Sequence, residues 1–555
     1  MAISNEEAPP PRLHPAKPIP FELVQHVGIF FEENLHIEAL RLLTNTLSTD
    51  PNTDIAVFTP SPQHLALAAT FLIHPSTTAR PKTDEEQETP HVALRMLLLV
   101  NNLVGPVNAR FDLAFRFKHF EASRHGGRRY ADGTSKKLVT NGERKIDLDK
   151  DINNELAQSA SVWSRAEDFW HAVGWAFNCA VLHPARWKYW RIWLEFMCQV
   201  LEDDWVQRQR LKDQDPSHDD QVLKDSIIVN YITQSQAGFG RDRRIMRAIF
   251  ADGGASAVNE FREVFRKELK LSRKKENKSK DLKKRSVAVN VDADEYGDFY
   301  APTDHEEDGT SPGRESKRPR RAAAMAKNDA AIPTLNPNSD STMPDPTLSS
   351  SLLGDTASLT LRQRLCHLLS TVSDSLPNIF MPLLDLYQLF VENIRHLPLP
   401  IYQAFVSPLA LTHFTPAACS TLCELLLYGL RDSAAVDSNE QYLTQSKLET
   451  CFLPYAAASS SLSDNVKMSI TLEALLVLLA DQGMIEVTEE TKQLTKKGII
   501  RRAEKAQHET RKNHVARMSE DMEWAWLGES AERLNFLVEE VIPASARVTS
   551  TTIGS

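Results

Sequence analysis

Residues 163–205, WSRAEDFWHAVGWAFNCAVLHPARWKYWRIWLEFMCQVLEDDW, hold seven of the nine tryptophans of this chain. Pro184 divides the stretch, because proline ends one helix and suits the first turn of the next. Ser164 and Glu167 have the spacing of a capping box, which satisfies free amides at a helix start. The stretch therefore predicts two consecutive helices, the first beginning near residue 164.

The apolar residues of the second predicted helix recur three or four positions apart and share one face. A helix this apolar is normally buried on several sides. Three interpretations of the tryptophans remain open: core side chains, a partner groove, or a base-stacking platform helped by the adjacent Arg186, Lys188 and Arg191. The helical spacing favours the core. The tryptophans that we assign to it are Trp170, Trp187, Trp190 and Trp205.

Helical periodicity continues on both sides of this stretch. One amphipathic helix is expected at 258–275, VNEFREVFRKELKLSRKK, where it runs into lysines. The best strand candidate is short, MIEVTEE at 484–490. The predicted fold class is all-α: two multi-helix domains joined by a long disordered linker. The helices have the length used in helical repeats, although no clean fixed period is present.

Residues 186–205, RWKYWRIWLEFMCQVLEDDW, resemble the aromatic-rich helices of half-a-TPR repeats. The resemblance is confined to this segment, and the sequence lacks the repeated copies that define the class. It is consistent with a helical scaffold and implies no particular activity.

Composition divides the chain. Segments that are rich in Pro, Ser and opposed charge blocks bury too little apolar surface to offset the entropy of ordering. The predicted organisation is a disordered N-terminus (1–19), an N-terminal helical domain (20–275) with a mobile loop (121–147), a disordered linker (276–355), a C-terminal helical domain (356–541) and a disordered tail (542–555).

The whole-chain composition is that of a soluble protein. The 555 residues are 42% hydrophobic and carry a formal net charge of −10, so a globally basic nucleic-acid coat is excluded. Six cysteines are too few for a disulfide scaffold of this size. Neither a secretory signal nor an uninterrupted apolar run of membrane-spanning length is present. These features predict a soluble, intracellular protein without a membrane partner.

Familiar catalytic and cofactor signatures are missing from the sequence. A phosphate-binding loop, a Gly-x-Ser-x-Gly elbow and a His-Glu-x-x-His helix do not occur, and Gly238-Phe-Gly240 lacks a preceding strand. The acidic run at 292–298 fails as a calcium loop because Tyr296 and Thr303 stand at ligand positions. We therefore expect no catalytic residue, no cofactor and no metal ion.

Cysteines and histidines also have a structural interpretation. Cys419 and Cys423 could bind metal together with His413 or Cys451, but their apolar helix favours buried thiols. The residues His171 and His183 flank aromatic helices without an identifiable carboxylate or nucleophile partner, so helix-boundary or core roles are expected.

Two basic clusters carry the functional prediction. Lys317, Arg318, Arg320 and Arg321 form a contiguous run that is typical of a nuclear import signal, and Ser311 before it is a candidate regulatory phosphosite. The basic segment 262–285 could contact nucleic acid or an acidic partner. The contact residues in this segment are Arg273, Lys274, Lys275, Lys283, Lys284 and Arg285.

The sequence favours a non-catalytic nuclear scaffold that assembles protein partners in a chromatin- or chromosome-associated complex. One alternative is an RNA-processing or ribosome-assembly factor that binds RNA through 262–285. The other is an enzyme whose scattered active-site residues form no recognisable motif. The expected partners are other proteins of a nuclear complex, with nucleic acid as a secondary possibility.

Overall fold

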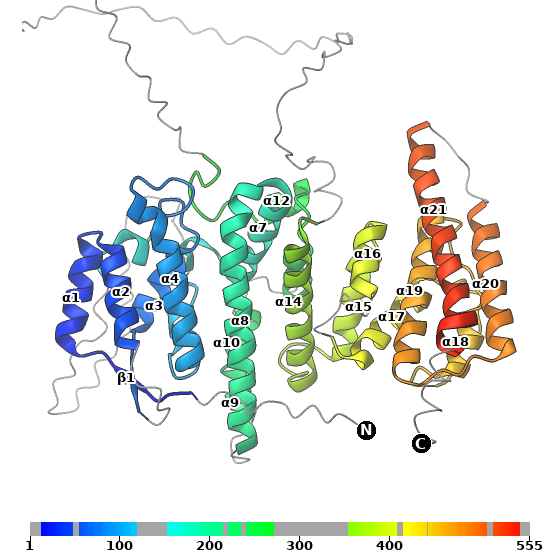
Figure 1. The fold of residues 1–555 in the computed structure, drawn as a ribbon, viewed down its shortest axis with the longest axis horizontal. Coiled ribbons are helices and arrows are strands. Elements are labelled where there is room, and N and C mark those ends of the chain that lie inside the picture. The colour runs from blue at the N-terminus through cyan, green and yellow to red at the C-terminus, as the bar shows by residue number, and fades with distance from the viewer. Residues whose placement is uncertain are drawn as a thin grey trace, which may run out of the picture. The chain divides into compact units, whose positions relative to one another are not determined.

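The structure is a computed structural model (Figure 1). It describes residues 13–47, 55–118, 152–214, 220–234, 240–270, 353–407, 414–440, 442–507 and 514–543. Across these residues the fold is all-α, as the sequence predicts. The strands found there, β1 (Ala16–Pro18) and β2 (Val57–Thr59), form one short parallel pair. The described residues of both halves of the chain belong to a single compact unit.

The first helices pack in succession. α1 (Phe21–Glu32) contacts α2 (His36–Leu47). Both α2 and α3 (Pro62–Phe71) contact α4 (Asp84–Leu103). Thr83 caps α4 by accepting a hydrogen bond from the Glu86 amide at 3.1 Å. The shorter N-terminal elements are α5 (Phe111–Ala114), the 3-10 turn η1 (Glu155–Ala157), α6 (Val162–Arg165), α9 (Gln221–Lys224), α10 (Ile227–Thr233), α11 (Arg241–Ile249) and α12 (Ala255–Glu260).

The tryptophan-rich stretch contains α7 (Phe169–Leu182) and α8 (Pro184–Gln214). The predicted capping box is wrong, because α6 is a separate turn and the extended Ala166 delays the next helix. Asp168 instead caps α7, accepting a hydrogen bond from the His171 amide at 2.7 Å. The predicted division at Pro184 is confirmed, since only His183 separates the two helices.

α8 is the long helix on which this part of the fold is assembled. Its 31 residues span about 46 Å at the usual helical rise. α7, α9, α10 and α14 (Thr356–Ser375) all contact it, and Figure 1 shows α14 lying alongside α8. Because other helices pack against several sides of α8, its apolar residues cover more of the helix surface than a single stripe would.

The amphipathic helix predicted at 258–275 is wrong for the described residues. α12 ends at Glu260, and residues 261–270 continue as turns in which Lys267 has a φ of 59°. This irregular segment buries Phe261 against α7. A Cβ at Gly174 of α7 would lie 2.3 Å from the Phe261 ring, so glycine is required for this contact. The apolar residues are buried, as their spacing suggests, but without a helix.

Two further local predictions are corrected. Residues 16–18, expected to be disordered, form β1, and the amide of Val57 donates to the carbonyl of Pro15 at 2.9 Å. The strand predicted at 484–490 is absent: residues 484–488 have no regular secondary structure, and a helix begins at Glu489. A strand needs a neighbouring strand to pair its backbone groups, and the described residues nearby are helical.

The C-terminal half is assembled around one central helix, α19 (Leu462–Asp481), most of whose apolar side chains are buried. α19 contacts α16, α17, α20 and α21. The bounds of the other C-terminal helices are α15 (Leu383–Ile394), α16 (Leu399–Val406), α17 (Pro416–Leu430), α18 (Gln445–Cys451), α20 (Glu489–Gln507), α21 (His514–Phe536) and the π-helical η2 (Leu537–Val541).

Most of the predicted terminal and linker segments lie outside the described residues, as does the loop at 121–147. Of the linker predicted at 276–355, residues 353–355 are described. Leu353 is buried, and Asp355 caps α14 by accepting from the Ser358 amide at 2.8 Å. Of the tail predicted at 542–555, Ile542 is buried. The ends of the packed unit therefore extend slightly beyond the predicted domain limits.

The two halves share buried contacts. Arg362 of α14 is fully buried and donates to the carbonyl oxygens of Ile249 and Ala251, and its guanidinium lies 4.0 Å from the centre of the Phe177 ring. Burial lowers the pKa of Arg362 to about 9, so the group still carries its charge at neutral pH. The Trp187 indole N–H donates to Asp355 at 2.9 Å. The apolar face of α14 is thus covered partly by the N-terminal half.

These contacts predict how separated halves behave. Fragments 13–270 and 353–543, expressed alone, should each expose the α8–α14 interface and aggregate or melt without a sharp transition. Mixed in equal amounts they should form a soluble complex with a cooperative thermal transition, measured by circular dichroism and size-exclusion chromatography. Cooperative melting of each fragment alone, with no association on mixing, would show that the halves are independent domains.

Candidate functional site

Burial suppresses thiol chemistry in the described residues. All six cysteines are free and buried. Desolvation raises the pKa of Cys198 and of Cys366 to about 12, and that of Cys419 to about 11. It raises the pKa of Cys423 as well. Because the thiolate is both the nucleophile and the metal ligand, these side chains act as small core residues.

No group of His, Cys, Asp and Glu side chains large enough to hold a metal ion occurs in the described ranges. His413, one candidate ligand beside Cys419 and Cys423, lies outside them. The Cys423 thiol instead donates to the carbonyl of Val406 at a distance of 4.0 Å. This geometry is that of a core thiol between neighbouring helices.

His171 and His183 have structural roles in the geometry. Nδ1 of His171 accepts from the Glu167 amide at 3.1 Å, and Nε2 donates to the carbonyl of Arg262 at 3.1 Å. Both ring nitrogens are therefore occupied. Desolvation lowers the pKa of each histidine, so both rings are neutral at neutral pH. His171 links the start of α7 to the segment that follows α12.

The tryptophans assigned to the core lie inside the protein. Trp170 and Trp190 are fully buried, and Trp187 and Trp205 are at most 5% exposed. The Trp170 indole N–H donates to the carbonyl of Tyr231 at 3.0 Å. Indoles in a core usually satisfy their N–H in this way. None of these four rings is exposed enough to stack on a base.

A buried carboxylate, Glu268, lies at the centre of the tryptophan cluster. One of its oxygens accepts from Nε and Nη2 of Arg186 at 2.9 and 2.6 Å, and from the Trp190 indole at 2.6 Å. The other accepts from the Trp175 indole at 3.1 Å and from the Phe265 amide at 3.2 Å. Arg186 is 4% exposed and Glu268 is 1% exposed. This is a buried ion pair whose polar atoms are widely satisfied.

Arg186 extends the network into the turn after α3. Its Nη1 donates to the Thr78 hydroxyl at 2.8 Å, and its Nη2 donates to the carbonyl of Ile73 at 2.6 Å. The same ion pair therefore fixes two irregular segments, residues 73–80 through Arg186 and residues 261–270 through Glu268. Within the two segments, the backbone hydrogen bonds are local turn contacts, such as those from the amide of Thr77 to the carbonyl of His74 and from the amide of Lys270 to that of Lys267.

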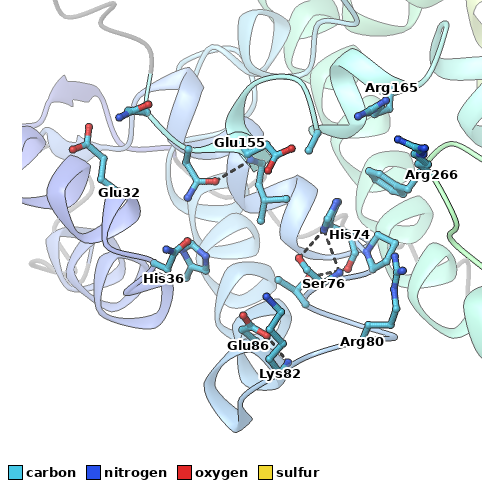
Figure 2. Close-up of a pocket in the computed structure, with 18 residues that line it drawn as sticks. Glu32, His36, His74, Ser76, Arg80, Lys82, Glu86, Glu155, Arg165 and Arg266 are labelled. Carbon is cyan, nitrogen blue, oxygen red and sulfur yellow. Dashed lines mark hydrogen bonds between the residues drawn. The ribbon is translucent and has the colours of Figure 1, made fainter. Parts of the chain in front are cut away.

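These two segments form part of the wall of a polar pocket of about 520 Å³ (Figure 2). Other walls come from the α1–α2 turn, the start of α4, η1 and the end of α6. In Figure 2, Arg165 and Arg266 lie near each other at one end of the pocket, with His74 and Arg80 next to them. Glu32 lies at the other end, and Glu155 lies between Glu32 and the arginines. The pocket thus has a cationic end and an acidic end.

The cationic end has little internal compensation. None of Arg80, Arg165 and Arg266 forms an ion pair with a described residue. Burial, and to a smaller extent the charges of Arg186, Arg80 and Arg165, lower the pKa of His74 to about 4. His74 is therefore neutral at neutral pH.

The orientation of His74 follows from its neighbour. Nδ1 accepts from the Ser76 amide at 3.2 Å and lies 2.7 Å from the Ser76 hydroxyl. With Nδ1 as the acceptor, the proton of the neutral ring resides on Nε2. The ring also packs edge-on against Phe265, with 4.9 Å between ring centres. His74 is thus a fixed hydrogen-bond donor rather than a mobile base.

A second recess lies between α4, α8 and α14 and has a volume of about 510 Å³. Its floor is apolar, and Leu98 within it is 37% exposed. Arg364 of α14 forms a two-point ion pair with Glu202 of α8, at 2.9 and 2.6 Å, at its side. We call this recess the α4–α8–α14 groove. The residues that line it are Leu94, Leu98, Ile192, Glu195, Phe196, Gln199, Ala357, Thr360, Leu361 and Arg364.

Of the basic clusters predicted from the sequence, only residues 262–270 of the segment 262–285 are described, and the specific contact residues lie outside the described ranges. This applies to the import signal, to the phosphosite Ser311 and to the nucleic-acid contacts. The residues concerned are Lys317, Arg318, Arg320, Arg321, Ser311, Arg273, Lys274, Lys275, Lys283, Lys284 and Arg285. They remain predictions.

Comparison of the chain with protein-family models and with curated proteins finds no match. In the part of the chain that the structure describes, no helix has both the length and the apolar character of a bilayer span. The functional argument therefore depends on the geometry of the pocket and the groove.

Sequence reasoning missed the residues that form these two sites. Arg80, Arg165 and Arg266 are isolated basic residues far apart in the chain, and Glu268 stands within a run of lysines and arginines that suggests a solvated surface. No periodicity distinguishes them. The one available signal was Glu268, an acidic residue among basic ones and close to phenylalanines, which is consistent with a carboxylate that is held in the core.

The buried ion pair predicts a strong and non-additive effect on stability. Glu268→Gln should lower the free energy of unfolding by about 3–5 kcal/mol, because Arg186 is left buried without a counter-charge. Arg186→Met should have a similar effect for the complementary reason. The double variant should cost clearly less than the sum of the two single variants, since no unpaired charge remains.

The measurement is urea unfolding of all four proteins, followed by tryptophan fluorescence and circular dichroism. Glu155→Gln, at an exposed carboxylate, serves as the control and should unfold like the parent. Additive losses in the two single variants would show that the two side chains are energetically independent.

Proposed function

We propose that this chain is a non-catalytic nuclear scaffold that assembles protein partners in a chromatin- or chromosome-associated complex. The observation that carries the scaffold part of this proposal is the α4–α8–α14 groove, an apolar recess flanked by charged side chains. The nuclear part rests on the basic run of Lys317, Arg318, Arg320 and Arg321. Apolar centres with polar rims are typical of surfaces that bind other proteins. Both halves of the chain contribute to it.

The groove suits one kind of occupant, an amphipathic helix of a partner protein. On both α8 and α14 the lining residues follow helical spacing over two turns, from Ile192 to Gln199 and from Ala357 to Arg364. The recess therefore runs along the helix axes. A helix that places apolar residues three or four positions apart can lie in such a groove. The neighbouring Arg364–Glu202 pair supplies polar contacts at the edge.

The described cysteines and His171 give little support to catalysis. The described cysteines have raised pKa values or are held in the core, and His171 uses both ring nitrogens in structural hydrogen bonds. A general base or a nucleophile needs an accessible and activated group. The groove itself presents aliphatic, amide and paired charged side chains.

Leu98→Glu tests the partner groove. The charge should abolish capture of the partner that uses this surface, while the fold remains intact because the leucine is partly exposed. Leu384→Glu is the matched control, because Leu384 is exposed by 55% and does not line the groove. Tagged parent and variant proteins are compared by quantitative affinity purification, followed by a binding assay with the purified partner.

A partner lost with Leu98→Glu and retained with Leu384→Glu supports the proposal. Equal recovery of every direct partner with both variants would contradict the assignment of the groove. Circular dichroism melts of both variants separate loss of binding from loss of fold.

The nuclear location has its own test. Replacing Lys317, Arg318, Arg320 and Arg321 with alanine should shift a tagged protein out of the nucleus, because import receptors bind exposed cationic runs. Replacing the basic residues at 273–285 in a parallel variant reveals whether that run contributes. Unchanged nuclear fluorescence in a variant that lacks both runs would refute an import signal in this part of the chain.

A further inference from the structure

The polar pocket in Figure 2 is separate from the α4–α8–α14 groove, since the two share no lining residue. Its cationic end brings together three arginines from three parts of the chain: Arg80 after α3, Arg165 at the end of α6, and Arg266 after α12. Like charges repel each other when they converge without compensation. An arrangement of this kind is stabilised when an anion enters.

We infer that this pocket binds the phosphate group of a phosphorylated serine or threonine in a protein partner. Arginine clusters recognise phosphate groups through charge-assisted and often two-point hydrogen bonds. The Nε2–H of His74 adds a neutral donor whose direction is set by Ser76. The pocket therefore combines positive charge with a fixed donor, which suits an oxygen-rich dianion.

The walls of this site are held in place before any ligand arrives. Arg186 fixes the segment that carries His74 and Arg80, and Glu268 fixes the segment that carries Arg266. The backbone that carries His74, Arg80 and Arg266 therefore needs little rearrangement on binding. Preorganisation of this kind raises affinity by reducing the entropy lost on binding.

A second polar feature faces the same pocket. His36 is 7% exposed, lines the pocket, and has an Nδ1 atom without a hydrogen-bond partner among the described residues. Burial lowers its pKa, so the ring is neutral at neutral pH. Buried polar atoms generally have partners in native proteins.

The acidic end selects the class of ligand. In Figure 2, Glu32 lies away from the arginines and Glu155 lies between Glu32 and the arginines, and both carboxylates are on exposed residues. A nucleic-acid strand carries a phosphate on every nucleotide, so its neighbouring phosphates would be repelled there. A phosphopeptide presents one dianion, and basic residues beside it can approach the glutamates. A single phosphorylated residue next to basic residues fits both ends of the pocket.

The test uses the full chain and a degenerate library of phosphoserine peptides, with the same library carrying serine as the comparison. Mass spectrometry should show that the protein enriches phosphopeptides, with lysine or arginine preferred on one side of the phosphoserine. Fluorescence anisotropy then gives the affinity of the best peptide. Inorganic phosphate and a single-stranded RNA oligomer are measured as competitors.

Arg80→Gln, Arg165→Gln and Arg266→Gln should each weaken binding about tenfold, the effect expected when one charge-assisted contact is lost. Arg95→Gln is the matched control, because Arg95 is exposed on α4 and does not line the pocket. Its affinity should match that of the parent. Glu155→Gln should retain phosphate dependence and reduce the preference for basic neighbours.

Three results would overturn the inference. Equal enrichment of serine and phosphoserine peptides would show that the pocket does not recognise phosphate. Displacement by RNA at lower concentrations than by the phosphopeptide would identify a nucleic-acid surface. Equal affinity for inorganic phosphate and for the best phosphopeptide would reduce the pocket to a site for the free ion. Thermal melts of the arginine variants confirm that each remains folded.

Discussion

The buried pair between Arg186 and Glu268 organises the N-terminal half of this protein. Removing two charges from water is costly, and the cost is offset only where the remaining donors and acceptors are satisfied. Here the carboxylate accepts from two indoles, an arginine and a backbone amide, and the arginine also reaches a hydroxyl and a carbonyl oxygen. The tryptophans therefore serve two purposes: they exclude water and they solvate the charge.

This arrangement gives shape to segments that have no regular secondary structure. The turn at 73–80 is attached to Arg186 and the segment 261–270 to Glu268. The two segments also touch each other, because His74 packs against Phe265. Phe261 is seated against Gly174 in the same region, which brings the segment close to α7. The polar pocket forms where these two segments meet the start of α4 and the end of α6. Its geometry is thus a consequence of core packing.

A second buried arginine joins the two halves of the chain. Arg362 of α14 enters the N-terminal half and donates hydrogen bonds to carbonyl oxygens at and just after the end of α11. Trp187 contributes a second link through Asp355. Because α8 and α14 also form the α4–α8–α14 groove, the groove exists only when the halves are packed together. A partner that binds there would stabilise the packed form by mass action.

The sequence by itself determined the all-α fold, the break at Pro184 and the buried face of α8, because helical periodicity and proline geometry act locally. It misplaced the start of α7, the helix at 258–275 and the strand at 484–490, where capping competition, close packing and missing strand neighbours decide the outcome. Only the tertiary structure placed Arg80, Arg165 and Arg266 around one pocket and buried Glu268 beneath it. The contacts that define both candidate sites join residues from tens to nearly two hundred positions apart. Such contacts arise from packing of distant helices, and a single sequence carries no periodic signal for them.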